Sequence, residues 1–117
     1  MKRLDIIIPR GHLRDLDKLL NKHKVEDMSF HTVKGRGRTQ YEPVSVGRST
    51  LRYVPEFGYW TRVEIVVLSD LLAENIINDI LEIMGSSAGI IGKIFVSDLA
   101  EAHAIRSRKK EARRLRS

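Results

Sequence analysis

The long stretch from Gly37 to Tyr59 constrains the fold most, because it follows no regular period and separates two segments that both read as strands. A small domain rarely contains so long a connection without secondary structure unless the connection has a function. The run Val33-Lys34-Gly35-Arg36-Gly37-Arg38 leads into it. Its glycines and arginines bring backbone N–H groups and cations to one place, which suits an anion such as a phosphate. We therefore expect the function to lie in this loop and in the cleft at its base.

Composition predicts one globular domain of 117 residues, with 42% hydrophobic and 31% charged residues. The absence of cysteine excludes disulfides and thiolate metal sites. No apolar run approaches the roughly 18 residues of a membrane span, and the N-terminus does not resemble a signal peptide, so we expect a cytoplasmic protein. The four histidines lack metal-ligand spacing and no catalytic constellation can be argued. We expect no metal site and no enzyme.

The net charge of +6 comes from the C-terminus, because residues 106–117 hold seven Lys and Arg against a single Glu. The rest of the chain carries equal numbers of basic and acidic side chains, so its composition does not indicate a nucleic-acid-binding surface. The segment from Ala100 to Ser117 reads as helical. Attraction of this tail to nucleic acid or an anionic membrane stays an alternative, with binding that would weaken steeply with salt. The tail lacks interleaved aromatic residues, so nothing suggests base stacking.

Hydrophobic periodicity predicts four strands and two helices. The strands are expected at residues 4–8, 28–33, 60–68 and 92–97, and the first helix has an apolar face formed by residues 13, 16, 19 and 20. Ser69 is a plausible N-cap for the second helix, which Gly85 is expected to follow. The order β-α-β-β-α-β indicates an α+β, ferredoxin-like fold, in which both helices cover one face of a four-stranded antiparallel sheet.

The uncovered face of this sheet is expected to be apolar. Ile7, Val66, Leu68 and Phe95 point away from the residues assigned to the helix side. A large apolar patch on a monomer favours burial by self-association, with closed symmetry. The sequence pattern alone does not count the subunits.

These features together resemble the P-II signalling family over residues 1 to about 100. The resemblance rests on Lys2–Ile8, Leu13, Met28, Val33–Arg38, Tyr53, Val63–Val67, Gly92–Val96 and Asp98. It implies a homotrimer with an adenine nucleotide in each cleft between neighbours. It also implies a P-II-like domain at residues 1–104, followed by a basic tail at 105–117. A T-loop at about 37–59 would dock on a transporter or enzyme of nitrogen or carbon metabolism, and a B-loop at about 85–92 would lie over the phosphates.

The resemblance implies the following nucleotide-binding residues: Ile7, Gly35, Gly37, Arg38, Val66, Ser86, Ser87, Gly89, Gly92, Lys93, Arg106 and Arg108. The register of the tail is open, since an ungapped count places Ala104 and Arg106 at the family's two arginine positions. The T-loop residues expected to contact a partner are Tyr41, Arg48, Arg52 and Tyr53, because aromatic and Arg side chains dominate interfaces. Tyr53 matches a position that some relatives modify.

Several departures from the family pattern concern the ligand. Ser86-Ser87-Ala88 stands where Thr-Gly-Lys is usual, and Ile91 replaces an acidic residue. Thr39 replaces a glutamine, with Gln40 one place later. Trp60 matches the lysine that helps to hold 2-oxoglutarate, and Trp cannot pair with a dicarboxylate; we expect it instead to pack with Phe57 and Tyr59. Sensing of Mg-ATP and 2-oxoglutarate is therefore in doubt.

Three readings remain open at this stage. The main one is a signal transducer that binds ATP or ADP, with AMP as a further candidate, and that regulates a partner protein, a membrane protein included. The second is a trimeric interaction module that has lost nucleotide binding. The third is a nucleic-acid-associated protein that uses its basic tail.

Overall fold

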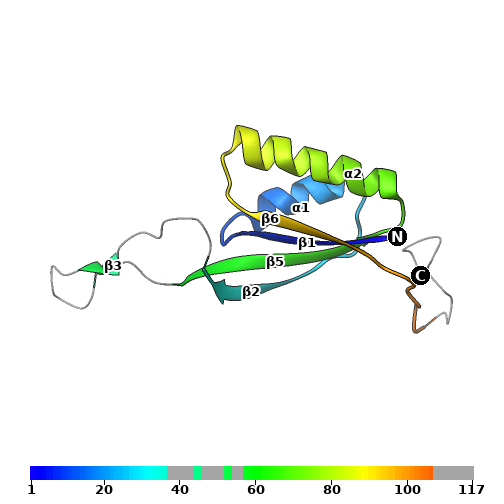
Figure 1. Cartoon of the computed structure of the whole chain (residues 1–117), viewed down its shortest axis with the longest axis horizontal. Helices are drawn as coiled ribbons and strands as arrows, with labels where there is room; N and C mark the ends of the chain where they lie inside the picture. The colour runs from blue at the N-terminus through cyan, green and yellow to red at the C-terminus, as the bar shows by residue number, and fades with distance from the viewer. Residues whose placement is uncertain (37–43, 46–51, 54–56, 107–117) are drawn as a thin grey trace.

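The computed structural model describes residues 1–36, 44–45, 52–53 and 57–106. Its elements are β1 (Lys2–Pro9), α1 (Leu13–Lys22), β2 (Ser29–Gly35), β3 (Val44–Ser45), β4 (Arg52–Tyr53), β5 (Gly58–Val67), α2 (Asp70–Asp79), the π-helix η1 (Ile80–Ser87) and β6 (Lys93–Asp98). The main sheet has the order β2-β5-β1-β6 with every neighbouring pair antiparallel. Both helices lie on one side of it (Figure 1). The predicted ferredoxin-like arrangement is confirmed.

Alternation along the central strands produces the core. Leu4 and Ile6 of β1 pair with Ile65 and Val63 of β5, and all four are buried against the helices. Helix α1 contributes Leu16, Leu19 and Leu20, and α2 with η1 contributes Ala73, Ile76, Ile80 and Met84. These residues recur at the spacing of a helix turn, so they form one apolar face on each helix, which is buried against the sheet. No helix within the described ranges is both long and apolar enough to cross a membrane.

The second helix begins as predicted and ends later. The Ser69 side chain accepts a hydrogen bond from the Leu72 backbone N–H at 3.2 Å, which is the N-cap interaction. The prediction that the helix ends before Gly85 is wrong, because η1 continues through Ser87 with widened turns. The Ala88 N–H bonds to a carbonyl five residues back. Gly89, at φ +68°, then turns the chain out of the helix.

Two other segments differ from expectation. The stretch at 37–59 was expected to lack regular structure, yet β3 and β4 form a short antiparallel pair within it and β5 starts at Gly58. Residues 99–106 contain no helix, so the helical prediction for the tail is wrong over the described part. In the loop, cross-strand pairing of β3 with β4 orders residues that show no local period. At the start of the tail, the Leu99 N–H donates to the Met1 carbonyl at 3.0 Å, a bond to another segment that overrides local helix propensity.

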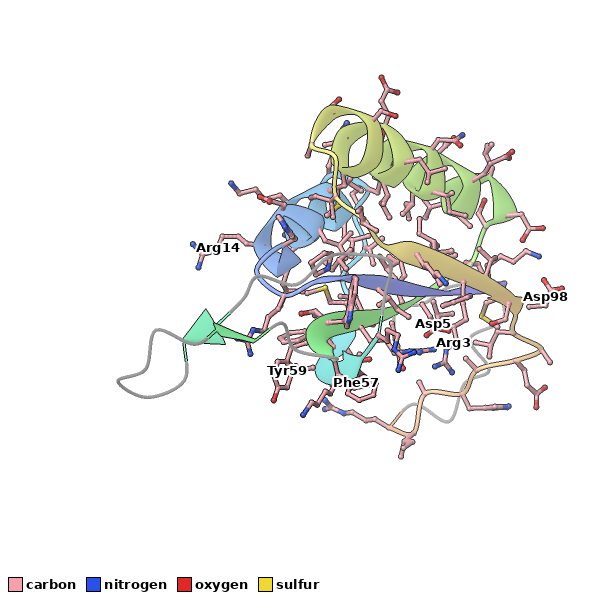
Figure 2. All side chains as sticks on the ribbon, turned by 60° about the vertical axis from the view of Figure 1, so that its left-hand side comes forward. Arg3, Asp5, Arg14, Phe57, Tyr59 and Asp98 are labelled. Carbon is pink, nitrogen blue, oxygen red and sulfur yellow. The ribbon has the colours of Figure 1, made fainter. Side chains whose placement is uncertain are left out.

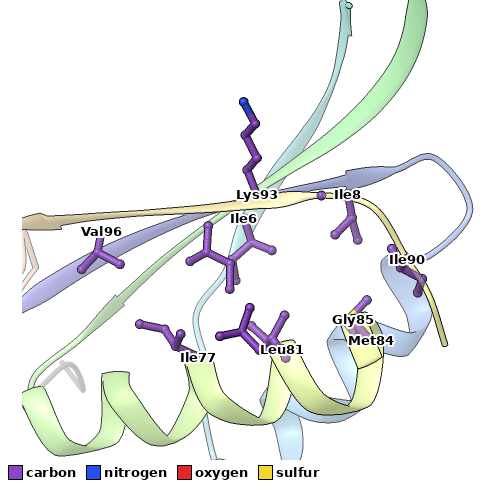
Figure 3. A pocket seen from close by; sticks show the side chains of 12 residues that line it. Ile6, Ile8, Ile77, Leu81, Met84, Gly85, Ile90, Lys93 and Val96 are labelled. Carbon is purple, nitrogen blue, oxygen red and sulfur yellow. The ribbon is translucent and has the colours of Figure 1, made fainter. Parts of the chain in front are cut away.

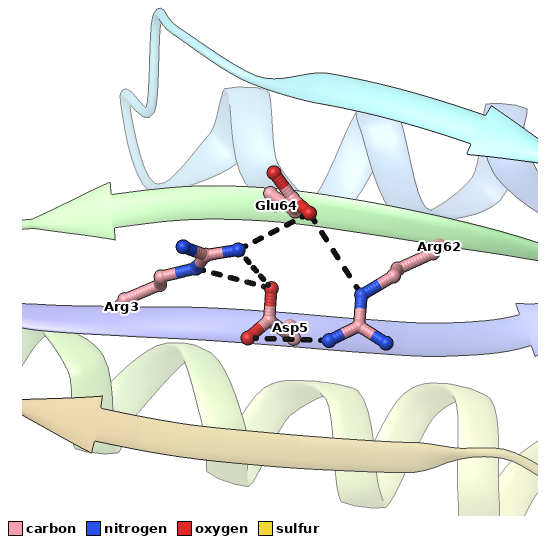
Figure 4. A network of polar contacts seen from close by, with 4 residues as sticks. All are labelled: Arg3, Asp5, Arg62 and Glu64. Carbon is pink, nitrogen blue, oxygen red and sulfur yellow. Dashed lines mark hydrogen bonds and ion pairs between the residues drawn. The ribbon is translucent and has the colours of Figure 1, made fainter.

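The open face of the sheet is not a continuous apolar patch, which corrects the expectation. Its centre holds a charged network of two arginines and two carboxylates, drawn in Figure 4. Arg3 lies 3.3 Å from Asp5 and 3.2 Å from Glu64. Arg62 lies 3.6 Å from Asp5 and 3.8 Å from Glu64. Ile7 and Val66 are only half-buried on this face, and Phe95 is exposed. The network separates the apolar side chains into smaller groups.

Candidate nucleotide-binding cleft

A cleft of about 490 Å³ opens on the uncovered face, at the end of the sheet nearest the long loop. Strand register assembles it, because Ile7 of β1 pairs with Lys93 of β6 while Val33 of β2 pairs with Trp60 of β5. Its lining combines apolar side chains, two glycines and two cations: Ile7, Val33, Gly35, Arg36, Trp60, Ile91, Gly92, Lys93 and Phe95. An apolar wall with a few cations suits an anion that carries an aromatic ring.

Gly92 forms part of the cleft floor for a steric reason. A Cβ added at this position would lie 2.3 Å from the Ile7 carbonyl oxygen, closer than real Cβ atoms approach. Only glycine lets the chain after η1 pass so close to β1. The predicted pair Ile7 and Gly92 therefore meets in the structure because the two backbones touch.

The two cations of the cleft are held in different ways. The Lys93 side chain projects away from the apolar pocket between β6 and the second helix (Figure 3), and thus toward the cleft. The Arg36 guanidinium carbon lies 5.4 Å from the centre of the Phe57 ring, which is within cation–π distance. Both cations are exposed, so an anion in the cleft can reach them.

One further predicted nucleotide residue, Val66, lies elsewhere on the same face. Val66 lines a second hollow of about 440 Å³, together with Glu26, Asp27, Met28, Ser29, Glu64, Ile65 and Ala102. None of these residues lines the cleft around Lys93. Carboxylates gather in this hollow, but no group of three or more His, Asp or Glu side chains within the described ranges could hold a metal ion. In a single chain four of the predicted nucleotide residues thus lie in the cleft and Val66 lies in the second hollow.

The serines assigned to the phosphate loop are part of η1. Ser86 and Ser87 occupy its last turn, and the Ser86 hydroxyl donates to the Leu81 carbonyl at 3.4 Å. Gly89 follows the helix and does not line the cleft. Arg106 is exposed at the end of the described segment. The structure does not bring these four residues to the cleft within one chain.

Other predicted residues lie outside the described part of the chain. These are Gly37, Arg38, Tyr41, Arg48 and Arg108. Arg52 and Tyr53 are described as backbone in β4, where they pair with Ser45 and Val44. Their proposed roles stay predictions.

The sequence interpretation missed five cleft residues, namely Val33, Arg36, Trp60, Ile91 and Phe95. Trp60 was expected to pack with Phe57 and Tyr59, but it is 7% exposed in the cleft wall whereas Tyr59 and Phe57 are 50% and 40% exposed. Strand alternation carries the missing signal, because consecutive residues of β5 point to opposite faces. Phe95 could have been found in the same way, between Ile94 and Val96.

Comparisons with known proteins concern the family and the fold of this chain. The model of the family described as "Nitrogen regulatory protein P-II" matches residues 1–109. Among curated proteins, none matches the chain. The chain resembles the solved structure titled "Structure of B. subtilis GlnK" with a TM-score of 0.68 and 19% identity, over 93% of each chain, which supports the fold. On the match over almost its whole length, the chain belongs to the nitrogen regulatory protein P-II family.

Proposed function

We propose that this P-II family member is a homotrimeric signalling protein that binds an adenine nucleotide in each cleft between neighbouring subunits. Nucleotide binding shifts the conformation of the T-loop at about 37–59, and a partner protein of nitrogen or carbon metabolism recognises one conformation. ATP and ADP are the main candidate ligands, with AMP as a further candidate. The partner is a transporter or an enzyme that the loop contacts.

The observation that carries the proposal is the convergence of Ile7, Gly35, Gly92 and Lys93 on one cleft. These residues come from three strands and the loop before β6, and the resemblance to the family assigned all four to the nucleotide. Val66, another of the expected contacts, lies in the second hollow of the same face. A closed ring of subunits would place the cleft of one chain against the hollow of the next. The division of the site thus supports a location between subunits.

The cleft wall also indicates which ligands fit. Trp60 and Phe95 supply aromatic surface for a base, while Lys93 and Arg36 supply charge for phosphates. Trp60 offers no cation where a dicarboxylate would need one. We infer that 2-oxoglutarate binding is lost or strongly weakened.

Titration with ATP, ADP and AMP, each with and without Mg²⁺ and 2-oxoglutarate, tests this function. Trp60 is the single tryptophan of the chain, so its fluorescence reports on the cleft while calorimetry gives the affinity. Lys93→Ala should weaken binding by roughly 10- to 100-fold, the value of a charge-assisted hydrogen bond. Lys18→Ala, an exposed lysine on α1, is the matched control and should leave the affinity unchanged. Folded protein without any nucleotide signal would refute the proposal.

One observation favours a second candidate, a P-II-like interaction module that no longer binds nucleotide. The Ser86 hydroxyl is used by η1, and exposed Ala88 stands where the family has a lysine. Both features weaken the phosphate-facing loop. The same titration separates the two candidates, because the folded module would give no signal with any of the three nucleotides.

A further inference from the structure

Cations and aromatic rings form a second surface at the base of the long loop, which we call the loop-base surface. Tyr59 is at its centre, with the Arg10 guanidinium carbon 5.1 Å and the Lys34 Nζ 5.8 Å from the ring centre. The sheet brings them together, because Lys34 of β2 pairs with Tyr59 of β5 and Arg10 follows the last residue of β1. Figure 2 shows Tyr59 and Phe57 together at this end of the molecule.

The surface continues one step further toward the loop. Gly35 pairs with Gly58, and beyond this pair Arg36 lies over the Phe57 ring, 5.4 Å from its centre. Tyr59 is 50% exposed and Phe57 40% exposed, and the three cations are exposed as well. Large aromatic side chains at this exposure, beside cations, are typical of interaction surfaces. The loop-base surface therefore comprises Arg10, Lys34, Arg36, Phe57 and Tyr59.

The Tyr59 ring orients Arg10 and Lys34 without neutralising them. A cation–π contact is worth only about 0.5–1 kcal/mol at an exposed site, and it leaves the formal charge in place. Neither Arg10 nor Lys34 pairs with a carboxylate in the described part of the chain. Preorganised positive charge is complementary to carboxylates. The Tyr59 ring is already used by Arg10 and Lys34, so it is poorly placed to stack on a nucleic acid base.

From this geometry we infer that the loop-base surface is a docking site for an acidic peptide segment of a partner protein. Glutamate or aspartate side chains of the segment pair with Arg10 and Lys34, and its apolar side chains pack against Phe57. The site is separate from the nucleotide cleft, because Tyr59 and Trp60 are consecutive in β5 and point to opposite faces. Arg36 alone belongs to both.

The test uses the full chain and a fluorescein-labelled, glutamate-rich peptide, with anisotropy as the readout. Arg10→Glu and Lys34→Glu should each weaken binding by about tenfold, whereas Lys18→Glu on α1 carries the same change of charge and should weaken it much less. Tyr59→Leu leaves the net charge unaltered but removes the ring; it should weaken binding about two- to fivefold, and Tyr59→Phe should restore the affinity. The basic tail is present in every variant and cancels in the comparison.

Three results would contradict the inference. Equal losses for Arg10→Glu and Lys18→Glu would mean that net charge, and not this surface, attracts the peptide. Equal affinities of the Leu and Phe variants of Tyr59 would show that the rings do not organise the cations. Tighter binding of a single-stranded oligonucleotide of matched charge, lost in the same variants, would assign the surface to nucleic acid. The response of Trp60 fluorescence to nucleotide should be the same in Tyr59→Leu as in the wild type. Failure of the peptide-docking inference is therefore distinguishable from failure of the nucleotide proposal.

Discussion

Because Gly92 has a hydrogen in place of a side chain, the backbone that leads into β6 can pass close to β1. The residue comes immediately before the last strand, β6, and a Cβ there would lie 2.3 Å from the Ile7 carbonyl oxygen. The oxygen belongs to the backbone of a central strand, so it cannot move aside as a flexible side chain would. The geometry of the cleft floor and the stability of the sheet edge therefore both depend on the absence of a Cβ atom at Gly92.

We expect Gly92→Ala to lower the free energy of unfolding by about 1–3 kcal/mol, the usual cost of overpacking, and to impair nucleotide binding in parallel. Gly85→Ala is the matched control, because nothing lies within 4 Å of a Cβ built there and its residue is helical. It should be neutral or stabilising by up to about 1 kcal/mol. Urea unfolding at fixed protomer concentration measures both. Equal midpoints for the two variants would contradict the steric argument.

At the scale of elements, an ionic contact joins the C-terminal ends of α1 and α2. The His23 Nε2 atom lies 2.6 Å from the Asp79 carboxylate, and the Lys22 Nζ atom lies 3.4 Å from it. The hydrogen bond from His23 is the main cause that lowers the pKa of Asp79 below its ordinary value of 3.8, and Lys22 adds to the effect. A carboxyl group with a lowered pKa stabilises the fold where it is ionised, and this contribution is lost as the pH falls through the lowered pKa.

Asp79→Asn should therefore destabilise the protein at neutral pH, and its difference from wild type should shrink once the pH falls below the ordinary Asp value of 3.8. Asp17→Asn on α1 serves as the control, because Asp17 has no ion pair in the described structure. Its effect should not follow this pH dependence. Urea midpoints measured from about pH 3 to pH 7 decide the matter. A pH-independent cost for Asp79→Asn would mean that packing, rather than charge, links the helix ends.

The N-cap residue Ser69 also stabilises a single element, because it satisfies a backbone N–H at the start of α2. Ser69→Ala removes the acceptor of the Leu72 N–H at the start of α2 and should cost about 1 kcal/mol. Ser69→Asp keeps an acceptor in place and should restore the stability. Thermal unfolding of the three proteins provides the measurement, and an Ala variant as stable as the Asp variant would show that water replaces the cap.

Elements with strong local signals could be predicted from the sequence, and those fixed by cross-strand contacts could not. The alternation of Val63, Ile65 and Val67 predicts β5, and Ser69 predicts the start of α2, because each signal is local. The end of the second helix was missed because Gly85 is tolerated inside η1, where nothing crowds it. The charged network at Asp5 and the cleft wall at Trp60 were missed because register places their partners, and register is not local.

At the scale of the whole molecule, the proposed nucleotide site should exist only between two chains. Lys93 belongs to the cleft and Val66 to the second hollow, and the structure places them in different depressions of the same face. A single substitution in either hollow should weaken binding at every site of a uniform assembly. An assembly that mixes the two variants is different, because some of its sites combine an intact cleft from one chain with an intact hollow from the next.

Coexpression of Lys93→Ala and Val66→Glu chains, with different tags and double purification, tests this arrangement. Every mixed trimer that survives both purification steps should hold about one intact site among its three, because only one junction joins an intact cleft to an intact hollow. Calorimetry should then find about one third of the sites with wild-type affinity for the nucleotide, whereas each variant alone binds more weakly at every site. Coexpressing two tagged copies of the Lys93→Ala chain is the control and should recover nothing. Mixed assemblies without recovered sites would place both residues in one chain's site, whereas a uniform Val66→Glu assembly with wild-type affinity would place Val66 outside it.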